Sequence, residues 1–417
     1  MIGYSEALAT ILAQSRRLDV LRCSAAQALG YMLAEPVVSP EYLPPFDNTA
    51  MDGFALHVVD GRLAAGAEFP VVGAQAAGDA WVQADGGAWE IMTGARMPEE
   101  LNAVVPVEQV EILDHDGDGR PLRIRLCADV AAGQHVRRRG EDVMQHAEIM
   151  GAGEPVQPQH VMLLAALGVA DVGVVRRPRV AIITTGRELV DDPAQALQSG
   201  QIRNSNGPFL AARVAAAGAD VVYRETVHDE QAAFVRALEK ALQAGADVVL
   251  STGAVSMGRY DFVPDTLRDI GADIAFHKVR IRPGKPLLFA RLPGGAQFFG
   301  LPGNPVSSAV GLRFFVEPAL RAMLGLPLEQ PLRVPLRTRF EKRASLRFFL
   351  KGRVTAGHNG QLHAIVLPGQ ESFRIRPLLD ANVWIVVPEE AGVCDMGTLV
   401  DIYGPGHLQW PSMGSAA

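Results

Sequence analysis

Two carboxylates in the middle of the chain stand beside runs of small residues, a combination suited to holding a cation next to an anion. Glu188 follows the run TTGR, and Asp261 closes the segment LSTGAVSMGRYD at 250–261. Small residues let backbone N–H groups approach an anion closely, and Mg²⁺ prefers oxygen ligands that it shares with phosphates. The two segments therefore predict a site for phosphate and Mg²⁺. Strand-to-helix turns capped by Thr and Asp are the structural alternative for each of them.

Cations on a stiff backbone form a second candidate site. Arg282 and Lys285 belong to the segment RPGKP, and residues 300–307 are GLPGNPVS. Proline fixes the backbone of both segments, and a guanidinium can bind an oxyanion through two parallel hydrogen bonds. A surface turn needs neither so many prolines nor so much nearby positive charge. We interpret these segments as a site for an oxyanion or a pyrophosphate.

Three segments nearer the N-terminus also combine polar groups with tight turns. They are PPFDNTAMDGFA (44–55), IMTGA (91–95) and RRRGEDV (137–143). Asp52 and Thr93 are candidate functional groups, with a capped domain-crossing turn and a Ser/Thr turn as the structural alternatives. The arginines of the third segment could line an anionic site or form a solvated charged face.

The pattern between residues 178 and 326 predicts the elements that position these groups. Residues 179–184 and 247–250 are apolar runs typical of buried strands, whereas 204–217 and 229–244 have helical spacing. Strands that alternate with helices indicate a parallel, doubly wound sheet, with helices on both faces. Ligands of such sheets bind beyond the carboxyl ends of the strands, and most of the candidate residues follow those ends.

Changes of composition divide the chain into four expected domains. They are a helical and linker domain (1–45 and 140–177), an inserted β-rich domain (46–139), the α/β domain (178–326) and a small barrel-like β domain (327–417). Helical spacing over residues 5–33 predicts one or two helices there. The fold class is thus multidomain α/β plus β, with a three-layer α/β domain at its centre.

Composition excludes several classes of protein. Of 417 residues, 48% are hydrophobic and 20% are charged, which is typical of globular proteins. A formal net charge of -7 argues against a dedicated nucleic-acid binder. We expect no membrane span, because the most apolar stretch is short and contains Asp171. Three widely spaced cysteines and an N-terminus unlike a signal peptide lead us to expect a cytoplasmic protein.

Seven segments in chain order resemble motifs of the molybdopterin molybdenumtransferase family, which includes bacterial MoeA and the E domain of gephyrin. They are FDNTAMDGFA, IMTGA, RRRGEDV, TTGREL, STGAVSMGRYDF, RPGKP and GLPGNPVS. Any one of these segments is weak evidence for the family, but all seven in this order are highly specific for it. The resemblance implies a homodimer of four-domain chains, with a site between the α/β domain and parts of the partner subunit. It also implies the molybdopterin adenylyltransferase as a candidate partner.

The resemblance further implies a reaction and its residues. Adenylylated molybdopterin and molybdate are the expected substrates, Mg²⁺ is the expected cofactor, AMP leaves, and molybdenum ends on the dithiolene sulfurs. The implied catalytic positions are Asp52, Thr93, Glu188, Asp229 and Asp261, of which Glu188 and Asp261 are the implied metal ligands. The implied substrate-binding positions are Arg137, Arg139, Thr252, Gly253, Ser256, Arg282, Lys285, Pro302, Gly303, Asn304, Pro305, Lys351 and Ser372.

This sequence departs from the family pattern at three positions. Ala254 replaces the second of two glycines, Arg282 stands where many members have Lys, and Lys351 stands where Arg is common. Charge is kept at the last two, but the geometry of Arg and Lys is not interchangeable.

Three other functions compete with this hypothesis. One is adenylyl transfer from ATP to molybdopterin, which the α/β domain alone would perform. Another is a scaffold without turnover, similar to the receptor-binding role of the gephyrin E domain. The third is a mononucleotide sensor, which would not need the segments around Asp52 and Thr93.

Overall fold

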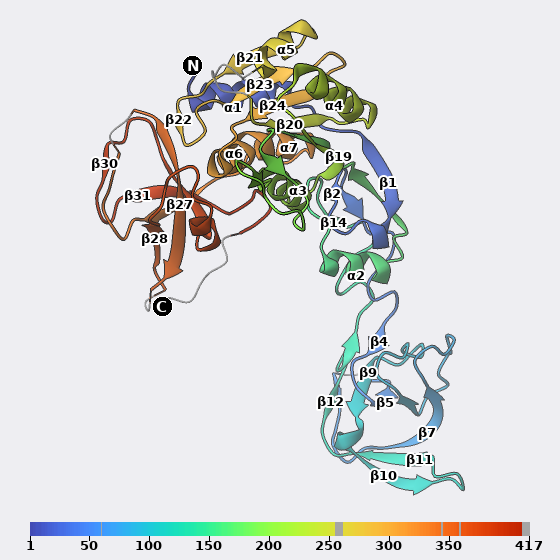
Figure 1. Cartoon of the computed structure of the whole chain (residues 1–417). Coiled ribbons are helices and arrows are strands. Elements are labelled where there is room, and N and C mark those ends of the chain that lie inside the picture. Colours follow the sequence, from blue (N-terminus) through green and yellow to red (C-terminus); the bar gives the residue numbers. More distant parts are fainter. Residues whose placement is uncertain (60, 255–261, 343–344, 358–359, 411–417) are drawn as a thin grey trace. The chain divides into compact units, whose positions relative to one another are not determined.

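The computed structural model describes residues 1–59, 61–254, 262–342, 345–357 and 360–410. The chain forms two compact units, each described here by itself (Figure 1). The first, called the α/β unit, comprises Met1–Leu21, Gly30–Ala34 and Val174–Ala417. The second, called the inserted unit, comprises Arg22–Leu29 and Glu35–Gly173. The expected division into four domains is finer than this and stays a prediction.

The inserted unit is built around a six-stranded sheet, as the β-rich composition predicts. Its strand order is β10-β11-β7-β8-β5-β9, and only β7 and β8 run parallel among its adjacent strands. Phe54, Leu56, Val105 and Ile124 pack in its core. The strands are β5 (Gly53–Leu56), β7 (Glu68–Gln75), β8 (Ala88–Ile91), β9 (Ala103–Pro106), β10 (Val110–His115) and β11 (Pro121–Leu126).

Short strand pairs and one helix complete the inserted unit. The pairs are β12–β6, β13–β4 and β14–β3. Helix α2 (Pro158–Ala166) lies within the second segment, 140–177, of the expected helical and linker domain. The remaining strands are β3 (Val37–Val38), β4 (Asn48–Thr49), β6 (Arg62–Leu63), β12 (Val130–Ala131), β13 (Val136–Arg137) and β14 (Glu148–Met150).

The central sheet of the α/β unit has the strand order β19-β16-β20-β24-β23-β21. The first four strands are parallel, as predicted. Strand β23 runs antiparallel to both of its neighbours, β24 and β21, which corrects the expectation of an all-parallel sheet. The cause is the short Pro-Gly-Gly turn at 293–295, because so short a connection can join only antiparallel strands. The strands are β16 (Arg179–Thr185), β19 (Asp220–Val227), β20 (Val248–Thr252), β21 (Asp273–His277), β23 (Leu288–Arg291) and β24 (Gln297–Leu301).

Helices cover both faces of this sheet, which confirms the three-layer architecture. Along β16, Val180 and Ile182 pack into one core, and Ala181 and Ile183 into the other. Alternate side chains of a strand point to opposite faces, so each core lies between the sheet and one helical layer. Helices α1 (Tyr4–Gln14), α3 (Asn206–Ala216), α6 (Pro305–Gly311) and α7 (Glu317–Met323) supply the first core, and α4 (Gln231–Gln243) and α5 (Val263–Asp269) supply the second.

The C-terminal part of the α/β unit is a barrel-like sheet, as expected. Its strand order is β22-β27-β29-β31-β25, and β28 pairs with β27. A bridge between Leu336 and Ala364 connects the segment after β25 to β28, so the sheet closes on itself. The strands are β22 (Ile281–Arg282), β25 (Leu332–Pro335), β27 (Arg347–Ala356), β28 (Leu362–Val366), β29 (Val383–Val387) and β31 (Leu399–Tyr403).

The helical prediction for residues 5–33 is only partly correct. Helix α1 ends at Gln14, and residues 20–24 form strand β1 (Val20–Ser24). Ser15 adopts an extended backbone, and its hydroxyl bonds back to the carbonyl of Ile11, so the helix stops there. No helix in the described part of the chain has the length and apolar character that a bilayer span requires.

Candidate active site

A cavity of about 680 Å³, called the strand-end cavity, opens where the parallel strands β16, β20 and β24 end. This is the edge at which the sequence predicts ligand binding. The structure brings together seven of the predicted site residues here. They are Glu188, Asp229, Thr252, Gly253, Gly303, Asn304 and Pro305.

Glycine at position 253 is required by the packing of two strand ends. Its φ is +92°, and a Cβ there would lie 2.5 Å from both the carbonyl oxygen and Oγ1 of Thr185. The Thr185 hydroxyl in turn donates to the carbonyl of Thr252 at 3.2 Å. These contacts place the backbone of the 252–254 turn against the end of β16, on the wall of the cavity.

Two predicted carboxylates line the same cavity from different loops. Glu188 follows β16 and is half-buried, and its Oε1 lies 2.8 Å from the Cβ position that Gly186 leaves empty. Asp229 follows β19 and is exposed, and its Oδ2 accepts a hydrogen bond from the backbone N of Arg187 at 3.3 Å. In the part of the chain that the structure describes, no donor bonds to the Glu188 carboxylate or to Oδ1 of Asp229, so both side chains can bind a cation.

The start of α3 contributes polar groups that the sequence reasoning missed. Asn206 is buried, and its Nδ2 donates to the carbonyl of Gly303 at 2.8 Å, which joins this helix to the predicted loop at 302–305. Asn204 donates to Asp191 at 2.8 Å and accepts from the backbone N of Gly207 at 3.0 Å. The polar run Asn-Ser-Asn-Gly at 204–207 was the available signal.

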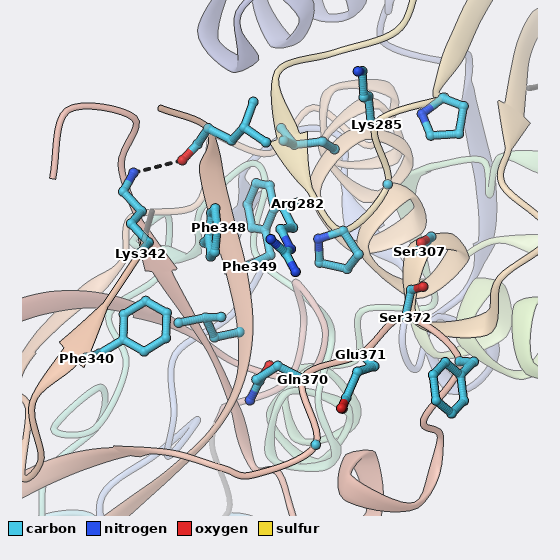
Figure 2. Close-up of a pocket in the computed structure, with 18 of the residues that line it drawn as sticks. Arg282, Lys285, Ser307, Phe340, Lys342, Phe348, Phe349, Gln370, Glu371 and Ser372 are labelled. Atoms are coloured by element: carbon cyan, nitrogen blue, oxygen red, sulfur yellow. Dashed lines mark hydrogen bonds between the residues drawn. The ribbon is translucent and has the colours of Figure 1, made fainter. Parts of the chain in front are cut away.

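A second cavity of about 950 Å³, called the basic cavity, is lined by Arg282, Lys285, Ser307, Lys342 and Ser372 among others. In Figure 2, the segment that carries Gln370, Glu371 and Ser372 lies along one side of this pocket, with Arg282 and Lys285 on the other. Among the described residues, no carboxylate oxygen lies within 4 Å of a side-chain nitrogen of Arg282 or Lys285, so neither forms an ion pair. Unpaired cations on the wall of a cavity suit an anionic ligand.

Lys351 lines neither of the two cavities, and its expected role in substrate binding stays a prediction. Only 1% of the residue is exposed. Its Nζ donates to the carbonyls of Gly369, Glu371 and Arg374 at 2.6, 3.3 and 3.1 Å. An ammonium has three protons, so these carbonyls use all of them. Lys351 therefore positions the loop 369–375. Burial lowers the pKa of the Lys351 ammonium.

The remaining proline of the predicted loop also acts through the backbone. Pro302 is buried, and its carbonyl accepts a short hydrogen bond from the hydroxyl of Ser308. Asn304 then precedes α6 with an extended backbone, and Pro305 is its first helical residue. Proline suits that position because the first N–H groups of a helix have no intrahelical partner.

In the inserted unit, Asp52 and Thr93 form a close pair. The Oδ1 atom of Asp52 accepts hydrogen bonds from the backbone N of Thr93 at 2.6 Å and from its Oγ1 at 2.8 Å. The backbone hydrogen bond, followed by the hydroxyl one, holds the pKa of Asp52 below its usual range. The carboxylate is exposed, and among the described residues no donor bonds to its Oδ2, so this oxygen can act on a ligand.

The third N-terminal segment joins this assembly. Arg138 pairs with Asp47 at 2.7 Å, and the backbone N of Arg139 donates to the same carboxylate at 2.7 Å. Burial alone would raise the pKa of Asp47, but these hydrogen bonds lower it overall. Arg137 is exposed, and the Arg139 guanidinium lies 4.0 Å from the centroid of the Tyr42 ring. Segments 44–55, 91–95 and 137–143 thus meet at one end of the inserted unit.

Two predicted site residues, Ser256 and Asp261, lie outside the described residues. Within the described ranges, no group of three or more His, Cys, Asp or Glu side chains is arranged to hold a metal ion. A cation in the strand-end cavity would therefore depend on Glu188, Asp229 and oxygen atoms supplied by a ligand.

Comparison with known proteins places all these segments in one family. Residues 2–168 match the MoeA N-terminal region (domain I and II), residues 181–322 a probable molybdopterin binding domain, and residues 333–404 the MoeA C-terminal region (domain IV). The chain is 34% identical over 411 residues to a molybdopterin molybdenumtransferase of Synechococcus elongatus, covering 96% of this chain and 99% of that protein. It is 39% identical over 311 residues to molybdopterin molybdenumtransferase 2 of Mycobacterium tuberculosis, covering 72% and 74%.

Solved structures agree with the sequence relatives. The molybdopterin biosynthesis MoeA protein of Pyrococcus horikoshii superposes with a TM-score of 0.80 at 26% identity, covering 98% of this chain and all of that one. A structure also described as a molybdopterin biosynthesis MoeA protein of Pyrococcus horikoshii gives a TM-score of 0.77 at 28% identity, covering 96% and 99%. With the relatives above, these matches span the described fold from end to end. The chain therefore belongs to the molybdopterin molybdenumtransferase family of transferases.

Proposed function

We propose that this chain inserts molybdate into adenylylated molybdopterin and releases AMP in a Mg²⁺-dependent reaction. One observation carries the proposal: a cavity lined by carboxylates and a cavity lined by unpaired cations lie in the same compact unit. The first suits a phosphate-bound cation, and the second suits an oxyanion. The family's name and the match of residues 181–322 to a probable molybdopterin binding domain supply the substrate class.

The chain's own residues bind and orient the two anionic substrates. Arg282 and Lys285 would hold the oxyanion, since neither forms an ion pair within 4 Å among the described residues, although Glu341 and Glu371 also line this cavity. The backbone of Thr252, Gly253 and the loop 303–305 would hold the phosphates, because small residues permit a close approach there. No covalent intermediate is required. Positioning and electrostatic stabilisation account for the rate enhancement.

The residues of the strand-end cavity fit Mg²⁺. This ion is usually held by one or two carboxylates and completes its shell with water and phosphate oxygens. Glu188 and Asp229 supply that number within the described residues, and Asp261 is the further ligand that the family resemblance implies. When bound, Mg²⁺ would stabilise the charge that develops on the leaving phosphate.

The proposal includes a cytoplasmic homodimer in which parts of the partner subunit complete the site. The exposed pair Asp52–Thr93 and the nearby Arg137 and Arg139 are the groups of the inserted unit offered to that site. The substrate must come from an enzyme that adenylylates molybdopterin, so an adenylyltransferase is the expected partner.

Substrate exchange tests the proposal against its alternatives. The pure protein is given either adenylylated molybdopterin with molybdate, or molybdopterin with ATP, both with Mg²⁺. We expect AMP from the first mixture only. Formation of adenylylated molybdopterin from the second would instead identify an adenylyltransferase. Tight binding of adenylylated molybdopterin without AMP release would indicate a scaffold.

A further inference from the structure

Phe373 lies on the wall of both cavities. It belongs to the lining of the basic cavity and to that of the strand-end cavity. Its side chain is 64% exposed. Isolated exposed apolar residues are common on proteins, so exposure alone means little. The position is what distinguishes this ring, because it lines the cavity that contains Arg282 and Lys285 and also the cavity that contains Glu188 and Asp229.

The backbone that carries Phe373 is held on both sides. Just before it, the carbonyl of Ser372 accepts a hydrogen bond from the backbone N of Val306 at 3.0 Å. This bond ties the loop 369–375 to the start of α6. Just after it, the carbonyl of Arg374 is one of the three that Lys351 binds. The aromatic side chain is therefore presented from a fixed loop, not from a free one.

A second anchor strengthens the same loop. The side-chain amide of Gln370 donates to the carbonyls of Lys351 and Leu367 at 2.9 and 2.7 Å and accepts from the backbone N of Lys351 at 3.0 Å. Both N–H groups of this amide and its carbonyl oxygen are thus bonded to β27 and to the chain just before the loop. A rigid aromatic side chain loses little conformational freedom when a ligand covers it, which favours affinity.

We propose that Phe373 binds the substrate by stacking against a planar nitrogen heterocycle where the two cavities meet. The inference rests on the proposed function, whose substrate carries a pterin and an adenine joined through a pyrophosphate. Both present a flat, conjugated ring face, and such faces stack on aromatic side chains. The Arg374 guanidinium lies 5.9 Å from the centroid of the Phe373 ring and pairs with the Glu371 carboxylate at 3.2 Å.

Direct binding to the full-length protein tests this inference without any turnover. AMP and a free pterin serve as separate probes, measured by isothermal titration calorimetry. We expect Phe373→Ala to weaken binding of one probe by about 10- to 100-fold, the usual range for loss of a stacking ring. The probe that is affected identifies the heterocycle. Phe373→Trp should keep the affinity of the wild type, whereas Phe373→Leu should lose most of it.

A matched control separates stacking from general damage. Trp410 is a 79% exposed aromatic residue that lines neither cavity, so Trp410→Ala should bind both probes normally. Equal affinity of the wild type and Phe373→Ala for both probes would overturn the inference, as would failure of the wild type to bind either probe. Full affinity in Phe373→Leu would also overturn it. If the transferase reaction fails but Phe373→Ala still loses binding, the proposed function is wrong and the stacking role stands.

Discussion

The carboxylate of Asp52 accepts hydrogen bonds from both the backbone N–H and the hydroxyl of Thr93, although Asp52 and Thr93 lie 41 positions apart in the chain. The pair fixes the position of one carboxylate oxygen and leaves the other exposed. It also joins the turn before β5 to the turn after β8. A hydroxyl in that second turn thus serves to orient the acid in the first.

Removing the hydroxyl should raise the pKa of Asp52 towards its ordinary value. Thr93→Val keeps the backbone N–H, so we expect only part of the lowered pKa to be lost, and Thr93→Ser should retain it all. The effect on stability follows from linkage. A carboxyl whose pKa is lowered in the folded state stabilises that state at pH values above its ordinary pKa, and this stabilisation is lost as the pH falls through the pKa of the folded state. An NMR titration of the Asp52 carboxyl carbon measures the shift. Identical titration curves in all three proteins would refute the role of the hydroxyl.

Substituting Gly253 should damage the strand-end cavity. In Gly253→Ala the new Cβ would meet Thr185 at 2.5 Å, so the 252–254 turn must move. We expect kcat/KM for AMP release to fall by about 10-fold or more, since displaced binding groups cost of order 1–3 kcal/mol. Gly271→Ala is the matched control, because Gly271 has a φ of +79° but nothing within 4 Å of its Cβ position. An equal loss in both variants would assign the effect to backbone strain alone.

Lys351→Met should destabilise the protein and loosen the loop that carries Phe373. Three carbonyls would lose their donor, at a cost of about 3 kcal/mol in the free energy of unfolding. Urea denaturation measures this value. Lys240→Met on α4 is the control, because Lys240 is an exposed partner of Glu225 and such pairs contribute less than about 1 kcal/mol. Equal stability of Lys351→Met and the wild type would contradict the positioning role.

His407 should make the folded state sensitive to acid. Burial, followed by the charge of Arg321, lowers the pKa of His407 from 6.5 to about 3. Its Nε2 donates to the carbonyl of Ala217 at 3.1 Å, and its Nδ1 lies 3.4 Å from the Arg321 guanidinium. Below pH 6.5 the unfolded chain therefore gains a proton at His407 that the folded chain does not. Stability should fall as the pH falls through this window.

The size of this effect can be isolated with one variant. Between about pH 7 and about pH 5, the wild type should lose about 2 kcal/mol more than His407→Gln, at roughly 1.4 kcal/mol per pH unit. Urea denaturation at both pH values gives the difference. His228→Gln, which changes an exposed histidine, should follow the wild type. If His407→Gln follows it too, His407 is not the group responsible.

The predictable features were those that depend on local sequence. Alternating strands and helices predicted the three-layer domain, and the carboxyl ends of β16, β20 and β24 brought Glu188 and Thr252 together as expected. The antiparallel edge was missed because the 293–295 turn was not recognised as a hairpin. Whether the carried-over residues act in catalysis stays a prediction.

Burial and loop neighbours were not predictable from spacing. Lys351 was expected to bind substrate, yet tertiary packing directs its ammonium towards three carbonyls of a distant loop. Nothing in the sequence around Phe373 indicated a functional role, because its position on the wall of two cavities depends on tertiary packing. Asn206 was missed because the residues around it are of types that are common at the start of a helix.

The rate of AMP release from adenylylated molybdopterin tests the central claim most directly. It is measured with and without molybdate for the wild type, Glu188→Gln and Glu239→Gln, the last being an exposed carboxylate on α4 outside the cavity. We predict molybdate-dependent release by the wild type and by Glu239→Gln, and a loss of about 10-fold or more in Glu188→Gln together with a higher Mg²⁺ requirement. AMP release at the same rate with and without molybdate, or no AMP release despite tight substrate binding, would contradict the account.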